Sequence, residues 1–331
     1  MNSDQRFAEV RDLTPELHEK SSGAIGHVVE IARIRMFQAR FDDALSLLDS
    51  AAGLPIYEHA EREDRVRHLL LKAEVLMFRA RFASSGHDSV LQPFEEAVKL
   101  AKELGDKRLA ADVAALNGWA LAYRHIGAAP PEVLGHAQRS LDLRREIDDQ
   151  VGIAEALFLI GLVHEQKKDR TDEDVARAEE LYREVLAITK LRGGKRWRSY
   201  ATRHLGWISM SRGDLDDALP FFEESLRLRQ EVGLRAFVPQ AYYALGVAHL
   251  KRGDLDEAVA YCQRAYDMAT ELANHSTRYW ALLAIGEVHE RRGEREEAMN
   301  RYTQVLEAAP AFGETLVDAA KEAIAGLEEA A

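Results

Sequence analysis

The sequence predicts an all-α fold, a superhelical solenoid of about seven antiparallel helical hairpins. The first observation is a segment that recurs at a period of 40 residues, as SRGDLDDA at 211–218, KRGDLDEA at 251–258 and RRGEREEA at 291–298. The second is a small residue that recurs upstream of each copy and continues towards the N-terminus. A fixed spacing of this size is typical of stacked helical repeats. The seven small residues are Ala32, Ala73, Gly118, Gly161, Gly206, Gly246 and Gly286.

Three segments follow in order along the chain. We expect residues 1–23 to form an N-terminal capping segment, whose short helix begins at Thr14 and ends before Gly23. Residues 24–310 form the solenoid, and residues 311–331 form a C-terminal capping helix with charged residues on its outer side. Since each unit of a solenoid contacts only its neighbours, the chain is expected to be one continuous domain.

Each predicted unit is a pair of helices joined by a tight turn. In AYYALGVAHLKRG, residues 241–253, apolar residues recur at intervals of three and four, and Gly253 supplies the left-handed backbone that ends a helix. Asp254 and Glu257 form a capping-box pattern at the start of the second helix. Ala258 then lies on the face that packs closely against the first helix.

The spacing of the units is not uniform. The steps between the seven small residues are 41, 45, 43, 45, 40 and 40. Polar or proline-containing insertions explain the longer steps, and we expect them to be loops. They occupy residues 85–90, 128–132 and 168–174.

The last two units carry the residues of a known repeat pattern, in which a Leu–Gly pair flanked by aromatic residues is followed by Ala, an aromatic residue and Pro. In this sequence those positions are Tyr242, Leu245, Gly246, His249, Ala258 and Cys262, then Leu282, Ile285, Gly286, His289, Ala298, Tyr302 and Pro310. The chain resembles the tetratricopeptide repeat family over residues 24–310. Its longer period resembles the repeats of the kinesin light chains. The resemblance implies a right-handed superhelix that binds its ligand on the concave side.

Composition limits the classes of function. Hydrophobic residues make up 47% of the chain and charged residues 30%, as in a folded helical protein. There is no apolar run long enough to cross a membrane, and charged residues interrupt the first twenty positions, so we expect a cytoplasmic protein without a membrane partner. Cys262 is the single cysteine, which excludes a disulfide within the chain.

The net charge of −12 argues against a broad nucleic-acid-binding surface. One basic stretch is an exception, RGGKRWRSYATR at residues 192–203, where arginines alternate with Trp197 and Tyr200. Such a stretch could bind phosphates or an acidic partner. The alternative is a solvated loop between repeats, followed by an ordinary helix start.

No residues are predicted to be catalytic, to bind a cofactor or to ligate a metal. No motif of a hydrolase, a metalloprotease or a phosphate-binding loop occurs in the sequence. His164, His249 and His289 each follow an anchor glycine by three residues, which indicates a packing role in every repeat. We therefore expect a protein that is not an enzyme.

The resemblance also implies which residues contact a ligand, because the family binds through fixed positions of the first helix of each repeat. Aromatic residues at solvent-facing positions would provide large rigid contact areas. The alternative is that these rings are packed in the core. The predicted ligand-binding residues of the concave groove are Trp119, Tyr123, Phe158, Tyr200, Arg203, Trp207, Tyr243, Lys251, Trp280 and Glu287.

Two functions are compatible with these expectations. The first is a non-catalytic interaction scaffold or adaptor that binds a peptide or protein segment in the concave groove. The second is a ligand- or peptide-sensing regulator, in which a short peptide or a metabolite shifts the superhelix. Self-association through an exposed end or through the groove is compatible with either function.

Overall fold

The computed structural model describes residues 14–83, 90–124, 130–308 and 314–329, and these residues form fifteen α-helices and no strand. The first helices of the seven hairpins are α2 (Thr14–Phe37), α4 (Arg62–Ala83), α6 (Lys107–Arg124), α8 (Gln150–Glu165), α10 (Lys195–Ser211), α12 (Val238–Arg252) and α14 (His275–Arg291). The second helices are α3 (Phe41–Ala52), α5 (Leu91–Leu104), α7 (Pro131–Glu146), α9 (Asp172–Arg192), α11 (Leu215–Glu231), α13 (Leu255–Glu271) and α15 (Arg295–Ala308), and α16 (Glu314–Glu329) follows them. The all-α solenoid with a C-terminal helix is confirmed.

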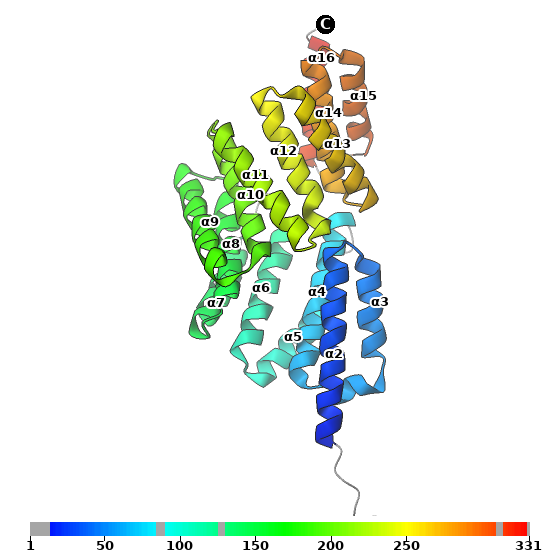
Figure 1. Ribbon diagram of the computed structural model, residues 1–331, viewed down its shortest axis with the longest axis vertical. Coiled ribbons are helices and arrows are strands. Elements are labelled where there is room, and N and C mark those ends of the chain that lie inside the picture. Colours follow the sequence, from blue (N-terminus) through cyan, green and yellow to red (C-terminus); the bar gives the residue numbers. More distant parts are fainter. Residues whose placement is uncertain (1–13, 84–89, 125–129, 309–313, 330–331) are drawn as a thin grey trace, which may run out of the picture.

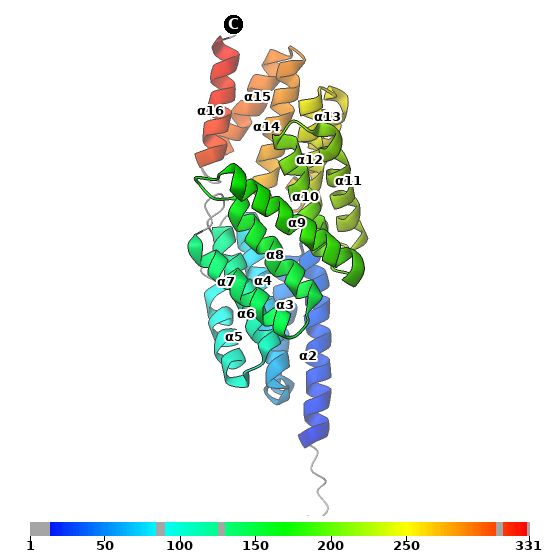
Figure 2. The ribbon, with the colours of Figure 1, turned by 90° about the vertical axis from the view of Figure 1, so that its left-hand side faces the viewer.

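The helices form an elongated stack with α2 at one end and α16 at the other (Figures 1 and 2). Each helix packs against the next, and each first helix from α2 to α12 also contacts the first helix of the following hairpin. The first helices therefore form an inner layer. In the part of the chain that is described, no helix combines the length and the apolar composition needed to cross a bilayer.

Glycine sets the distance between the two helices of a hairpin. A Cβ atom at Gly161 would lie 2.6 Å from Tyr182 Cε1, and one at Gly206 would lie 2.6 Å from Phe222 Cε1. At Gly246 the obstacle is Cys262 Sγ, at even closer range. The side chain of the second helix thus rests directly on the backbone of the first, which explains why small residues recur at this register.

The turns between helices follow the sequence prediction only in part. Gly213, Gly253 and Gly293 have φ values of 87°, 91° and 76°, in the left-handed region that favours glycine. The capping box predicted at Asp254 is wrong, because this side chain makes no cap hydrogen bond. Its carboxylate instead accepts hydrogen bonds from His249 and Arg252.

The recurring histidine has a specific role in these turns. His164 Nδ1 lies 3.0 Å from Asp174 Oδ1, His249 Nδ1 lies 3.1 Å from Asp254 Oδ2, and His289 Nδ1 lies 2.5 Å from Glu294 Oε2. In each case the end of the first helix is linked to an acidic residue at the start of the second. The histidines are structural, as the sequence indicated, but they act through hydrogen bonds across the turn.

Two local predictions need correction. The helix expected to end before Gly23 continues to Phe37, because packing of α2 against α3 and α4 outweighs the weak helix propensity of glycine. The loop predicted at 168–174 ends at Thr171, where a capping box with Asp174 begins α9. The insertion at 85–90 lies almost entirely outside the described residues, as does the first part of the one at 128–132. The division at residues 23 and 310 stays a prediction.

The superhelix brings its second and fifth repeats together. The Phe237 ring, in the short 3₁₀-helix η3 (Arg235–Phe237) after α11, lies 5.1 Å from the Phe78 ring and 5.7 Å from the Phe82 ring of α4. Arg196 of α10 donates to Glu74 of α4 at 2.9 Å, across 122 positions of sequence. These contacts close the inner side of the stack into a narrow groove.

We predict that Gly246→Ala lowers the free energy of unfolding by about 1–3 kcal/mol, because the added methyl group overlaps Cys262 on the facing helix. Urea unfolding followed by circular dichroism measures the change. Gly26→Ala is the matched control, since a Cβ atom there meets nothing within 4 Å. The control should be neutral or stabilising by up to about 1 kcal/mol. Equal effects in the two variants would contradict the proposed role of the anchor glycine.

Candidate ligand-binding groove

A cavity of about 270 Å³ lies on the inner side of the stack, at its N-terminal half. We call it the groove cavity. Its walls come from α2, α4, α6, α7, α8 and α10, so five successive repeats contribute to it. It is lined by Arg33, Arg67, Leu70, Leu71, Glu74, Met77, Phe78, Asp112, Ala115, Leu116, Trp119, Arg144, Glu155, Arg196 and Trp197.

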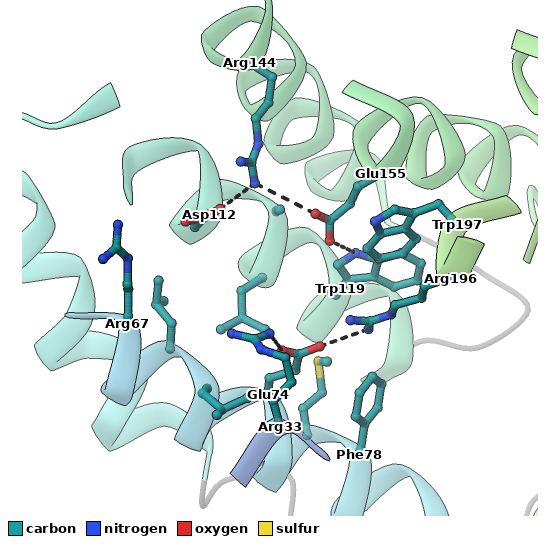
Figure 3. Close-up of a pocket in the computed structure, with 15 residues that line it drawn as sticks. Arg33, Arg67, Glu74, Phe78, Asp112, Trp119, Arg144, Glu155, Arg196 and Trp197 are labelled. Carbon is teal, nitrogen blue, oxygen red and sulfur yellow. Dashed lines mark hydrogen bonds and ion pairs between the residues drawn. The ribbon is translucent and has the colours of Figure 1, made fainter. Parts of the chain in front are cut away.

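One side of the groove cavity is a charged cluster around Arg144 (Figure 3). This guanidinium is 5% exposed and lies 2.5 Å from Asp112 Oδ1 and 3.8 Å from Glu155 Oε2. Glu155 Oε1 also accepts a hydrogen bond of 3.1 Å from Trp119 Nε1. Burial raises the pKa of Glu155 to about 7, against the opposing effect of Arg144. This carboxyl can therefore exchange a proton near neutral pH.

The opposite side is built around Glu74, whose carboxylate lies between two arginines (Figure 3). Arg196 lies 2.9 Å from Glu74 Oε1, and Arg33 lies 3.8 Å from Oε2. The Arg196 guanidinium also lies over aromatic rings, 4.6 Å from the Trp197 centroid and 5.7 Å from the Phe78 centroid. A delocalised cation is favourable over such rings. The basic and acidic groups of this wall thus neutralise one another.

Arg67 differs from the other arginines of the groove cavity. Its ion pairs are with Glu63 and Asp64, one turn away on α4 itself. Its side chain is 45% exposed. It can therefore contact a ligand without breaking a bond between helices.

A second cavity, of about 110 Å³, shares the wall formed by Trp119. We call it the arginine chamber, because Arg81, Arg203 and Arg229 line it. Its other lining residues are Trp119, Ala122, Tyr123, Phe158, Leu162, Gln166, Tyr200, His204, Phe237 and Gln240. The two cavities are neighbours along the same groove.

The structure brings five of the ten predicted groove residues together. Trp119 lines both cavities. The other four line the arginine chamber, and they are Tyr123, Phe158, Tyr200 and Arg203. They come from α6, α8 and α10, so residues of three successive first helices line one cavity.

The other five predicted residues lie elsewhere. Trp207 and Tyr243 are half-buried with ring centroids 6.1 Å apart, and the Trp207 ring lies 5.3 Å from that of Phe222. Trp280 packs beside α16, and Lys251 is exposed. Glu287 lines a separate cavity between α14 and α16. None of the five lines the groove cavity or the arginine chamber.

Three rings that were expected to face solvent are buried. Trp119 is 6% exposed, Phe158 is 2% exposed and Tyr200 is 6% exposed. Trp119 is stacked on Trp197 with centroids 5.8 Å apart, and on Phe158 at the same separation. The alternative that the rings belong to the core is therefore correct for these residues, although they also form cavity walls.

Three cations of the basic stretch at 192–203 are paired with carboxylates of the same molecule. Lys195 lies 3.0 Å from Glu231, Arg196 lies 2.9 Å from Glu74, and Arg198 lies 3.0 Å from Glu224. The helix α10 begins within this stretch, at Lys195. The charges of these three side chains are therefore not free for a ligand, whereas Arg203 lies in the arginine chamber.

Sequence reasoning missed two buried arginines. Arg144 and Arg229 lie on second helices, and each precedes the anchor glycine of the next repeat by seventeen residues. At the same register the neighbouring repeats have Thr189 and Ala269, both buried. An arginine at a position that is otherwise small was the available signal.

The described residues contain no candidate metal site. No group of three or more His, Cys, Asp or Glu side chains there is placed to hold a metal ion. Cys262 is buried, and burial raises the pKa of its thiol to about 12. It behaves as a small apolar residue of the helix interface.

Family models for the tetratricopeptide repeat match residues 200–232 and 237–311. These segments cover three of the hairpins whose geometry is described above. These three hairpins are tetratricopeptide repeats. No curated protein sequence matches the chain.

Several solved structures share the fold of this protein. A Rap protein complexed with competence and sporulation factor is 13% identical, with a TM-score of 0.62 over 88% of this chain and 78% of that one. NprR in complex with its cognate peptide NprX is 14% identical, with a TM-score of 0.57 over 93% and 88% of the two chains. Aspartyl phosphate phosphatase F from Bacillus subtilis is 12% identical, with a TM-score of 0.51 over 93% and 94%. At these identities the likeness concerns the fold alone.

We predict that Glu155→Gln changes how stability depends on pH. The folded-state pKa of Glu155 lies above the value of about 4.3 for an unfolded chain, so the native state binds the proton more tightly and stability falls as pH rises from about 4 to about 7. Glutamine removes this loss. From pH 5 to pH 8 the variant should gain roughly 1–3 kcal/mol relative to wild type.

Urea unfolding at several pH values provides the measurement. Glu180→Gln, at an exposed position of α9, serves as the control for replacing a surface carboxylate by an amide. A pH-independent difference between Glu155→Gln and wild type would contradict the raised pKa of Glu155.

Proposed function

We propose that this protein is a non-catalytic interaction scaffold that binds a peptide or protein segment in the groove cavity. The observation that carries the proposal is the composition of its wall. Arginines and carboxylates from five successive repeats alternate around an apolar floor that includes Leu70 and Met77. An extended segment needs such a surface, because its backbone and side chains present donors, acceptors and apolar groups in succession.

The solved structures of similar fold support a peptide or protein ligand. One holds competence and sporulation factor, and another holds the cognate peptide NprX. The groove cavity of this chain lies on the inner layer of helices, where a peptide could cross several repeats. The identity of the ligand follows from the site and not from the fold, so the test below starts from unbiased sequences.

We predict that peptides selected against the wild-type protein bind Arg67→Glu about tenfold more weakly, since a cation that faces the ligand is reversed. A random dodecapeptide library on phage supplies the peptides, and fluorescence anisotropy of the synthesised sequences gives Kd. Arg67 forms ion pairs only within its own helix, so the fold should persist.

Arg62→Glu is the matched control. Arg62 lies on the same helix but pairs with Glu103 of the outer helix α5 at 3.6 Å. It should bind the selected peptides within about twofold of wild type. A library without enrichment, or peptides that bind Arg67→Glu as well as wild type, would contradict the proposal.

A second candidate function is a sensor whose superhelix responds to its ligand. The observation that favours it is the link between Arg196 and Glu74, which joins the fifth repeat to the second and forms a wall of the groove cavity. A ligand that binds either side chain competes with this link. The separation of the two repeats would then depend on ligand binding.

If the protein is a sensor, Arg196→Gln should resemble the ligand-bound state, because it removes the link to Glu74. Hydrogen–deuterium exchange should show faster exchange in α4 and η3, both in the variant and in wild type with a selected peptide. Arg198→Gln is the control, since Arg198 pairs with Glu224 of the adjacent α11. If the peptide does not change hydrogen–deuterium exchange in α4 and η3, the sensor function is excluded and the scaffold function is retained.

A further inference from the structure

The arginine chamber gathers three guanidinium groups in a small volume of an acidic protein. Arg81 belongs to α4, Arg203 to α10 and Arg229 to α11, so the groups come from the second and fifth repeats. The chain as a whole has a net charge of −12. Three cations that converge on one cavity of about 110 Å³ need an explanation.

The positive charge is not balanced by the walls of the chamber. No carboxylate lines it, and none of the three arginines forms an ion pair with a residue that the structure describes. Arg203 donates to His204 Nε2 at 2.9 Å, and Arg229 donates to the carbonyl oxygen of Phe237. The groove cavity differs, since Arg33, Arg144 and Arg196 are each paired with a carboxylate there.

Glu165 is the acidic group that interacts electrostatically with Arg203, but it does not line the chamber. Its Oε2 atom accepts hydrogen bonds of 2.6 Å from Tyr182 and 2.6 Å from His204 Nδ1. Its carboxylate therefore offsets part of the positive charge of Arg203 from behind the chamber wall, while its oxygen atoms bond to the helix interface.

Several polar atoms of the chamber lack a partner within the protein. Arg203 Nε, Arg229 Nε and Tyr200 Oη are buried and make no hydrogen bond to any described residue. Arg229 is 1% exposed and Tyr200 is 6% exposed. Buried donors and charges without partners are unfavourable, which is why native proteins pair them. A bound group with acceptor oxygens would satisfy all three.

We propose that the arginine chamber binds a compact oxyanion, the acidic group of the ligand that occupies the groove. Guanidinium groups bind carboxylate and phosphate oxygens through paired hydrogen bonds. Tyr200 Oη and the amides of Gln166 and Gln240 add donors, and Phe158 and Leu162 exclude bulky polar groups. Because Trp119 is common to both cavities, a peptide in the groove cavity can place an acidic side chain or its C-terminal carboxylate past this ring.

The choice of a peptide as the source of the oxyanion rests on the proposed function, but the chamber can be tested without it. Inorganic phosphate is the first probe, titrated into the full chain by calorimetry at constant ionic strength. Wild type should bind it, and Arg81→Gln should weaken Kd about tenfold or more, the effect of losing one charge-assisted hydrogen bond. Arg79→Gln is the matched control on α4, since Arg79 pairs with Asp42 outside the groove, and it should bind as wild type does.

The second probe identifies the source of the oxyanion. Two random hexapeptide pools are compared, one with Asp, Glu and a free C-terminus, the other without Asp and Glu and with an amidated C-terminus. Preferential capture of the first pool by wild type, lost in Arg81→Gln, assigns the site to a peptide carboxylate. If wild type binds phosphate but captures both peptide pools equally, the site binds a free anion, and the proposal of an oxyanion site still holds.

One result overturns the proposal. If neither phosphate nor the acidic pool distinguishes wild type from Arg81→Gln, the arginines are structural. Arg229→Met guards against a folding artefact, because it removes a buried charge while keeping a long side chain. This variant should lose phosphate binding and keep a cooperative melt at or above the wild-type Tm. Failure of the dodecapeptides to bind would overturn the proposed function alone, since phosphate binding does not depend on them.

Discussion

The contact between the two helices of a hairpin, made at a glycine without a Cβ atom, is the constraint on which the rest of the structure depends. Tyr182, Phe222 and Cys262 rest on the backbone of the preceding helix because Gly161, Gly206 and Gly246 leave room for them. That contact fixes the rotation of the first helix. The same register then points inward in successive repeats, and side chains from distant parts of the sequence meet in one groove.

The groove places charged groups where a stable core would have apolar ones. Arg144 is paired with Asp112, and Glu74 is paired with Arg196. Buried ion pairs of this kind contribute little net stability, because desolvation offsets their attraction. The arginine chamber is less favourable still. Burial, together with repulsion from Arg203, lowers the pKa of Arg229 to about 9. Perturbed groups that gather in cavities are typical of binding sites, and a ligand that supplies negative charge would remove the cost.

The fold could be predicted because its information is local. Each hairpin repeats the spacing of small and apolar residues, so seven pairs and a final helix follow from the sequence. The pairing of Arg196 with Glu74 could not be predicted, since it depends on the small rotation between repeats accumulated over 122 positions. The same closure buries Trp119 and Phe158, which a single open repeat would expose. The capping box predicted at Asp254 does not form, because His249 and Arg252 donate hydrogen bonds to this carboxylate instead.

The candidate site lies where the sequence departs from its own repeat. One register of the second helix holds Ala101, Thr189 and Ala269 in three repeats and is buried in each. In two other repeats the same register holds Arg144 and Arg229, which enter the groove cavity and the arginine chamber. An arginine at a core position carries a desolvation cost that the small residues of the other repeats avoid. Two such departures open onto neighbouring cavities, and this coincidence supports the proposal that the inner face of the N-terminal half binds a ligand.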